Sequence, residues 1–156
     1  MTLRLRISPC PNDTFMFDAL LNGRIDTGGL HFDVEYRDIE ALNRGVQAGE
    51  ADVSKISCAV LPAVADGYAL LDSGAALGRG NGPLLVRRAG DRSPIRRVAV
   101  PGVHTTANAL MMRLFPRITE RTPADAGSYR TLRRYGNHGA HERGRALLHR
   151  ACGDGA

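Results

Sequence analysis

The sequence predicts an α/β fold built around a largely parallel sheet. Along the first 115 residues, runs with apolar side chains at every second position alternate with runs whose apolar positions recur at helical spacing. Hydrophobic residues make up 43% of the 156-residue chain, which is enough for a buried core. No apolar run approaches the length of about eighteen residues that a membrane span needs. We therefore expect one ordinary domain, or one lobe and part of another.

The first predicted strand leads directly into a helix. Residues 3–7 alternate apolar side chains with arginines, as a strand does, and two prolines that follow stop the strand because neither can donate to a sheet ladder. Asn12 and Asp13 offer side-chain oxygens that can cap a helix, and Gly23 is placed to end it. We therefore expect a strand, a tight turn and a capped helix.

The same alternation continues after this helix. Residues 30–36 have period-two apolar positions, and Asp38 can cap a helix whose buried stripe contains Ile39, Leu42 and Val46. The remaining predictions follow in chain order: a short strand at 52–57, the start of a helix at 58–64, strands at 68–71, 83–86 and 97–100, and a helix at 105–114. This order of elements is the basis of the α/β assignment.

The last forty residues break the pattern. Residues 117–156 contain no Val, Met or Phe, too little apolar surface to offset the entropy of ordering the segment. Eight arginines against four carboxylates place most of the net charge of +5 there. A bias toward GC-rich codons accounts for this arginine content, so we predict no nucleic-acid partner. The predicted parts are a first α/β lobe at 1–90, the start of a second lobe at 91–116 and an atypical arginine-rich tail at 117–156, disordered or read in a shifted frame.

The cysteines and the chain start indicate a reducing compartment. Cys10, Cys58 and Cys152 are far apart and odd in number, and no pair of them has the spacing of metal ligands. The first residues alternate apolar and charged side chains instead of forming the apolar stretch of a signal peptide. We therefore expect a cytoplasmic protein without a metal site, in which the cysteines are structural.

Two segments carry candidate binding residues, because ligands of open α/β sheets sit beyond the carboxyl ends of the strands. Thr105 and Thr106 follow the Pro101-Gly102 turn at a helix start, where backbone N–H groups favour a carboxylate or phosphate; alternatively, Thr105 only caps the helix. Lys55 is the single lysine of the chain and ends a strand close to Ser57. Its ammonium could hold a substrate anion or could be a solvated surface charge.

Five segments together resemble one family, the 1,4-dihydroxy-6-naphthoate synthases. In chain order these are Ser8-Pro9-Cys10-Pro11-Asn12-Asp13-Thr14-Phe15, Asp38-Ile39-Glu40-Ala41-Leu42-Asn43, Lys55-Ile56-Ser57, Ala76-Leu77-Gly78-Arg79-Gly80, and Val98-Ala99-Val100-Pro101-Gly102 with His104-Thr105-Thr106. They occur in the order and with the spacing of that family. Such a series of motifs is far more specific than any one of them.

The resemblance implies a fold, a reaction and a set of binding residues. The fold would be like that of type II periplasmic binding proteins, with the first lobe and the start of the second present in this chain. The enzyme would be a lyase of menaquinone biosynthesis that converts cyclic dehypoxanthine futalosine to 1,4-dihydroxy-6-naphthoate by carbon–carbon cleavage, without metal or organic cofactor. The substrate carries a carboxylate, and its binding residues would be Lys55, Ile56, Ser57, Thr105 and Thr106.

The chain also departs from the family pattern. In the family a His-Glu pair of the second lobe, followed by an aromatic residue, supplies the general base; here His141-Glu142 is followed by residues 143–145, which include no aromatic. We therefore assign no catalytic residue, and we expect a shortened chain whose activity the sequence leaves open, as it does the oligomeric state. Two alternatives stay open: a non-catalytic small-molecule binding module of the periplasmic-binding-protein type, and a chorismate dehydratase of the same pathway.

Overall fold

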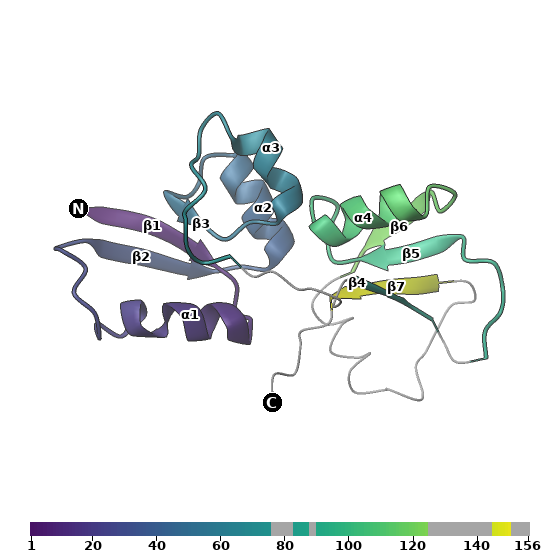
Figure 1. Ribbon diagram of the computed structural model, residues 1–156, viewed down its shortest axis with the longest axis horizontal. Coiled ribbons are helices and arrows are strands. Elements are labelled where there is room, and N and C mark those ends of the chain that lie inside the picture. Colours follow the sequence, from purple (N-terminus) through teal and green to yellow (C-terminus); the bar gives the residue numbers. More distant parts are fainter. Residues whose placement is uncertain (76–82, 88–89, 125–144, 151–156) are drawn as a thin grey trace. The chain divides into compact units, whose positions relative to one another are not determined.

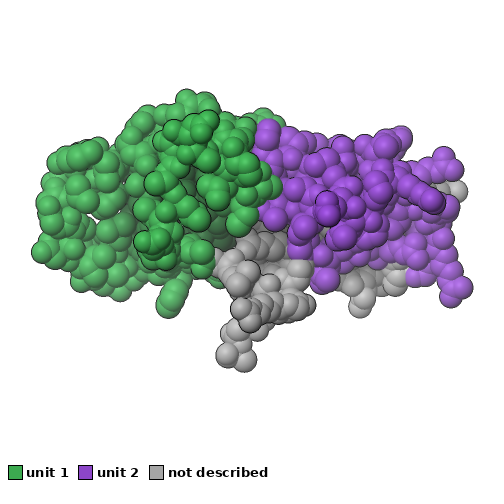
Figure 2. Space-filling view, turned by 45° about the horizontal axis from the view of Figure 1, so that its top comes forward, with its two compact units in different colours: residues 1–75 green, residues 76–156 purple. Residues whose placement is uncertain are grey.

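The chain divides into two units, residues 1–75 and residues 76–156 (Figure 2). The structure, a computed structural model, describes residues 1–75, 83–87, 90–124 and the backbone of 145–150. Each unit has strands and helices of its own, and parallel strand pairs occur in both, which confirms the predicted mixed α/β class. The predicted boundaries at residues 90 and 116 stay predictions. Within the described ranges, no helix is long and apolar enough to cross a membrane.

Unit 1 is a three-stranded parallel sheet with helices on both faces (Figure 1). The strand order is β2-β1-β3, with α1 against one face and α2 and α3 against the other. The elements are β1 (Thr2–Ile7), α1 (Pro11–Leu21), β2 (His31–Tyr36), α2 (Ile39–Gln47), β3 (Val53–Ser54), a 3-10 turn (Cys58–Val60) and α3 (Leu61–Val64). The helix that begins at Cys58 was predicted, whereas the strand predicted over 52–57 is reduced to two residues.

The two helix starts of unit 1 differ in how their first N–H groups are satisfied. Asp38 caps α2 as predicted, because one of its carboxylate oxygens accepts hydrogen bonds from the backbone N–H groups of Glu40 and Ala41, each at 2.9 Å. For α1 the predicted cap was wrong. The residue before α1 is Cys10, whose side chain makes no capping hydrogen bond, and Asp13 turns back toward the end of β1 instead.

The segment at 68–71 corrects another expectation, because it is not a strand. The Tyr68 hydroxyl donates to the backbone oxygen of Ala51 at 2.8 Å, and the ring packs against the buried cluster of Val46, Val60 and Val64. Leu70 and Leu71 are 68% and 62% exposed. No strand in the described part of the chain pairs with this segment, and its contact with the core is made by the Tyr68 side chain.

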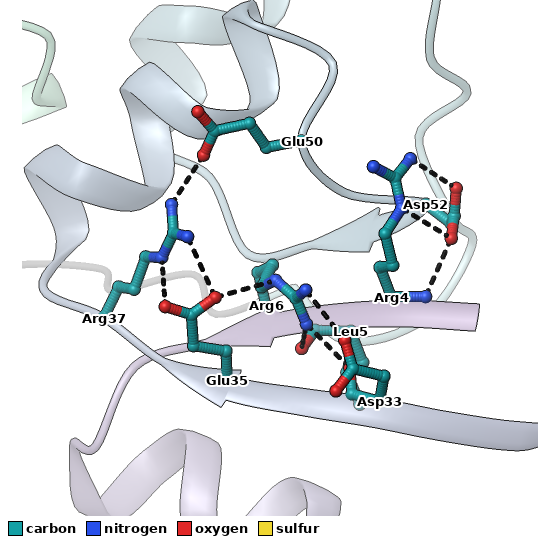
Figure 3. A network of polar contacts seen from close by, with 8 residues as sticks. All are labelled: Arg4, Leu5, Arg6, Asp33, Glu35, Arg37, Glu50 and Asp52. Carbon is teal, nitrogen blue, oxygen red and sulfur yellow. Dashed lines mark hydrogen bonds and ion pairs between the residues drawn. The ribbon is translucent and has the colours of Figure 1, made fainter. Parts of the chain in front are cut away.

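One face of the unit 1 sheet is charged rather than apolar (Figure 3). The arginines of β1 alternate with the buried Leu5 and Ile7, and the β1–β2 register sets them opposite carboxylates of β2. We call the following seven residues the arginine–carboxylate network: Arg4, Arg6, Asp33, Glu35, Arg37, Glu50 and Asp52. This face can remain polar because opposite charges on the neighbouring strands β1 and β2 pair with one another.

The network shifts the acid–base properties of its members. A two-pronged contact from Arg4, at 2.9 and 3.1 Å, and a hydrogen bond from the Arg4 backbone N–H lower the pKa of Asp52 to about 2. Hydrogen bonds from Arg37 lower the pKa of Glu35, and its bonds to Glu35 and Glu50 raise the pKa of the Arg37 guanidinium. Glu35, Arg37 and Asp52 are therefore ionised near neutral pH.

Unit 2 is a four-stranded sheet with the order β4-β7-β5-β6 (Figure 1). Strand β5 is parallel to β6 and β7, and β4 is antiparallel to β7. The elements are β4 (Pro83–Val86), β5 (Arg97–Val100), α4 (Thr106–Leu114), β6 (Glu120–Pro123) and β7 (Arg145–Arg150). The first three were predicted. The strands β6 and β7 lie in the segment whose apolar residues are too sparse to indicate strands, and both pair through their backbones with β5.

The core of unit 2 joins β5 to α4. Val98 and Val100 point toward Met111 of α4, and all three are at most 1% exposed. Ala107 and Ile118 complete this buried cluster. The end of β5 is thereby held firmly against the start of α4, and the turn between them carries the second group of predicted binding residues.

Candidate functional site

The topology of unit 1 brings together the segments that follow β1 and β3. These two strands are parallel neighbours, and the backbone N–H of Lys55 donates to the oxygen of Arg6 at 3.0 Å. Ser8 and Lys55, which come directly after the paired stretches, therefore emerge at the same edge of the sheet. That edge is where ligands of parallel sheets bind.

Four side chains form a closely bonded group at this edge, which we call the Lys55 cluster: Ser8, Cys10, Asp13 and Lys55. The Lys55 ammonium lies 2.7 Å from Asp13 Oδ1, 3.2 Å from Ser8 Oγ and 3.4 Å from Cys10 Sγ. The other carboxylate oxygen, Asp13 Oδ2, accepts from the Ser8 backbone N–H at 3.0 Å and from its hydroxyl at 2.6 Å. Lys55 is thus not the solvated surface charge that one interpretation of the sequence allowed.

The electrostatics of the cluster depend on the carboxylate of Asp13. Its side chain is 5% exposed, against 25% for Lys55. Burial by itself raises the pKa of Asp13, but the hydrogen bonds from Lys55 and Ser8 together outweigh burial and lower it. Asp13 is therefore ionised at neutral pH, and its carboxylate balances the positive charge of Lys55 within the same unit.

Ser57 is held by a second polar contact. Asn43 lies on α2 and is completely buried; its amide nitrogen is 3.0 Å from Ser57 Oγ, and its Oδ1 accepts from the Ser57 backbone N–H at 2.9 Å. Between Lys55 and Ser57, Ile56 turns its side chain toward the buried cluster of unit 1. The polar groups of Lys55 and Ser57 thus lie at this edge of the sheet, while Ile56 anchors the segment to the core.

The second group of predicted binding residues lies at the start of α4 in unit 2. The Thr105 hydroxyl donates to the oxygen of Gly102 at 2.8 Å and accepts from the Asn108 backbone N–H at 3.3 Å, so Thr105 caps the helix. Thr106 is the first residue of α4. The Asn108 amide nitrogen donates to the oxygen of Val103 at 2.8 Å, while its Oδ1 is buried without a hydrogen-bond partner among the described residues.

The predicted binding residues thus form two groups, one in each unit. Lys55, Ile56 and Ser57 belong to unit 1, and Thr105 and Thr106 belong to unit 2. Each group lies after the carboxyl end of a parallel strand, as the sequence analysis predicted. Among the described ranges, no three or more His, Cys, Asp or Glu side chains gather in a group that could hold a metal ion.

Sequence reasoning missed three residues that hold these segments: Asp13, Asn43 and Asn108. Asn43 carried a usable signal, since it lies on the same helical stripe as Leu42 and Val46 and is polar where a buried side chain is expected. A buried polar side chain in such a position must have partners. Asp13 was instead assigned to capping, because nothing local distinguishes a capping aspartate from one that pairs with a distant lysine.

Comparison with known proteins identifies the family. A family model described as menaquinone biosynthesis matches residues 3–128. The chain therefore belongs to this menaquinone biosynthesis family. The match spans both groups of predicted binding residues.

Two curated relatives and one solved structure are similar to the chain. The 1,4-dihydroxy-6-naphtoate synthase of Streptomyces coelicolor is 50% identical over 115 residues, 73% of this chain. The synthase of the same name from Thermus thermophilus is 48% identical over 114 residues, 70% of this chain. In both comparisons the match covers 40% of the relative. The crystal structure of protein AF1704 from Archaeoglobus fulgidus matches 95% of the chain and 54% of its own, with a TM-score of 0.76 and 31% identity.

Proposed function

We propose that this chain carries a substrate-binding part of a 1,4-dihydroxy-6-naphthoate synthase. Such a lyase converts cyclic dehypoxanthine futalosine to 1,4-dihydroxy-6-naphthoate by carbon–carbon cleavage in menaquinone biosynthesis. One observation carries the proposal: about half of the residues are identical to those of two synthases so named, over stretches of 115 and 114 residues. The family match at 3–128 includes every predicted binding residue.

Each of the two segments, taken by itself, offers groups that suit a carboxylate or a hydroxyl of a ligand. Ser57 and Thr106 offer hydroxyl groups, and the start of α4 adds the positive end of a helix dipole. Because Lys55 is already paired with Asp13, we assign it a smaller part in holding the substrate charge than the sequence alone indicated. We assign no group as the catalytic base.

The wider architecture is part of the same proposal. We propose a fold like that of type II periplasmic binding proteins, in which residues 1–90 form the first lobe and residues 91–116 begin the second. Support comes from the parallel strand pairs of each unit and from the similarity to the solved relative. Action in the cytoplasm without a cofactor remains our prediction, and so does the absence of a nucleic-acid partner.

Calorimetric titration of the purified chain with cyclic dehypoxanthine futalosine tests the proposal. We expect saturable binding, with chorismate as the control ligand showing none. Replacing Thr106→Ala should weaken binding about tenfold, the value of one hydrogen bond to a ligand. The matched control is Thr27→Ala, which removes a partly exposed threonine in a turn of unit 1 and should leave the affinity unchanged.

Chromatography of the same mixtures separates the alternatives. Formation of 1,4-dihydroxy-6-naphthoate establishes the lyase activity in this chain. Binding without product supports the non-catalytic binding module. Preferential binding of chorismate supports the dehydratase, and no binding of either compound contradicts the proposal.

A further inference from the structure

The contact between Asn43 and Ser57 has a defined polarity. The amide of Asn43 faces two groups of Ser57, its backbone N–H and its hydroxyl. A backbone N–H can only donate a hydrogen bond. The Asn43 atom 2.9 Å from that nitrogen must therefore be the oxygen, and the amide nitrogen necessarily faces Ser57 Oγ, 3.0 Å away.

This polarity decides what the Ser57 hydroxyl can do. The amide nitrogen of Asn43 donates, so Ser57 Oγ accepts and keeps its own hydrogen for another partner. Within the part of the chain that the structure describes, no side chain or backbone oxygen takes that hydrogen. Ser57 is partly exposed, whereas Asn43 is fully buried and cannot turn over without leaving the Ser57 N–H unpaired.

The neighbouring Lys55 is engaged differently. An ammonium has three hydrogens to donate, and the Lys55 nitrogen lies within hydrogen-bond distance of three groups in its own unit, belonging to Ser8, Cys10 and Asp13. A ligand contact with Lys55 must displace one of these. In the segment 55–57, the hydroxyl of Ser57 is therefore the side-chain donor that costs no internal bond.

We propose that Asn43 is a positioning residue that fixes Ser57 as a hydrogen-bond donor to an acceptor oxygen of the substrate, a carboxylate oxygen. The inference rests on the proposed function for the identity of the ligand. The polarity of the Asn43–Ser57 contact itself stands on the geometry of unit 1 alone. Asn43 touches no ligand in this scheme and acts through Ser57.

A measurement without ligand tests the contact. In the nuclear magnetic resonance spectrum, Ser57→Ala should shift the two side-chain amide protons of Asn43 and leave those of Gln47 in place. Gln47 is the internal control, since it lies one turn further along α2 and its amide donates to the backbone oxygen of Asn43. The Ser57 backbone amide should exchange slowly in the unmodified chain and in Asn43→Asp, and quickly in Asn43→Ala. Unshifted Asn43 protons would overturn the contact.

A second measurement tests the role in binding, with cyclic dehypoxanthine futalosine as the probe. Asn43→Asp keeps an oxygen for the Ser57 N–H but supplies a second acceptor that takes the hydroxyl hydrogen. We therefore expect Asn43→Asp and Ser57→Ala each to weaken binding about tenfold. The double variant should be no weaker than Ser57→Ala alone, because both changes remove the same donor. Asn43→Ala, which leaves the hydroxyl free to donate, should weaken binding less than Asn43→Asp.

The controls separate a positioning role from a structural one. Gln47→Ala removes an amide from the same helix without touching Ser57 and should leave the affinity unchanged. Additive losses in the double variant, or a greater loss in Asn43→Ala than in Asn43→Asp, would overturn the role in binding. Urea unfolding of each variant shows whether it folds. If Asn43→Asp does not fold, the role in binding is decided by whether Ser57→Ala weakens binding more than Asn43→Ala does. If the unmodified chain does not bind the compound, the proposed function fails, and the spectroscopic measurement alone decides the polarity of the contact.

Discussion

The segments 55–57 and 101–105 both follow parallel strands, but different kinds of contact hold them. Lys55 is held by Asp13, which lies 42 positions away in the sequence, and Ser57 is held by Asn43, which lies 14 positions away. The segment 101–105 is held by contacts within itself and with the first turn of α4. Thr105 bonds to Gly102, three positions away, and Asn108 bonds to Val103, five positions away. The first segment therefore depends on the sheet of unit 1 being assembled, whereas the described side-chain hydrogen bonds of the second segment join near neighbours in the sequence.

The largest effect should come from breaking the distant contact of the first segment. Lys55→Met removes the ammonium and leaves the Asp13 carboxylate buried and ionised, which should reduce the free energy of unfolding by about 3 kcal/mol or more. Combining it with Asp13→Asn should recover most of the loss. The exposed Arg24–Asp18 pair is the control, because Arg24→Met should cost less than about 1 kcal/mol. If urea unfolding gave the same loss of unfolding free energy for Lys55→Met and Arg24→Met, the comparison would be contradicted.

The second-largest effect should come from acid, which weakens the contact between Lys55 and Asp13. The pKa values of Asp13 and Asp52 are lower in the folded chain than in the unfolded chain, so the folded state binds fewer protons. Their contribution to stability is present above the unfolded pKa of about 4 and is lost as the pH falls through each folded pKa, which for Asp52 is about 2. The urea midpoint should therefore fall over this range. In Lys55→Met the fall should begin at higher pH, because burial without the ammonium raises the pKa of Asp13.

Breaking the local contact of the second segment should have a smaller effect. Thr105→Ala removes the cap of α4 and should lower the free energy of unfolding by about 1 kcal/mol. Thr105→Ser keeps the capping oxygen and is the matched control. A loss as large as that of Lys55→Met, measured by the same urea titration, would show that this segment also depends on distant contacts.

The smallest effect should come from the arginine–carboxylate network. The carboxylates that pair with Arg37 are 44% and 50% exposed, so water and salt screen them. Arg37→Gln should therefore lower the urea midpoint slightly at low salt, and the difference should vanish at about 1 M salt, where the screening length is about 3 Å. A difference that persists at high salt would indicate a packing role for the aliphatic part of Arg37.

Elements whose signals are local were predicted well. Alternation at residues 3–7 and 30–36, the cap at Asp38 and the start of the helix near Thr105 all depend on near neighbours, and the structure confirms them. The failures have a common cause. Residues 68–71 have a strand-like pattern but no partner strand among the described residues. The strands β6 and β7 lie in a segment with few large aliphatic residues, and both pair through their backbones with β5.

The candidate site shows the same distinction between local signals and contacts that form only in the folded chain. The places of Lys55, Ser57, Thr105 and Thr106 after strand ends were predictable from the sequence, because strand ends in parallel sheets meet at one edge. That these residues bind a ligand was implied by the family resemblance and stays a prediction. Only the folded chain reveals that Asp13 neutralises Lys55 and that Asn43 orients Ser57. Those contacts join segments that only the β1–β3 pairing and the packing of α2 bring together, and no local pattern encodes such a partner.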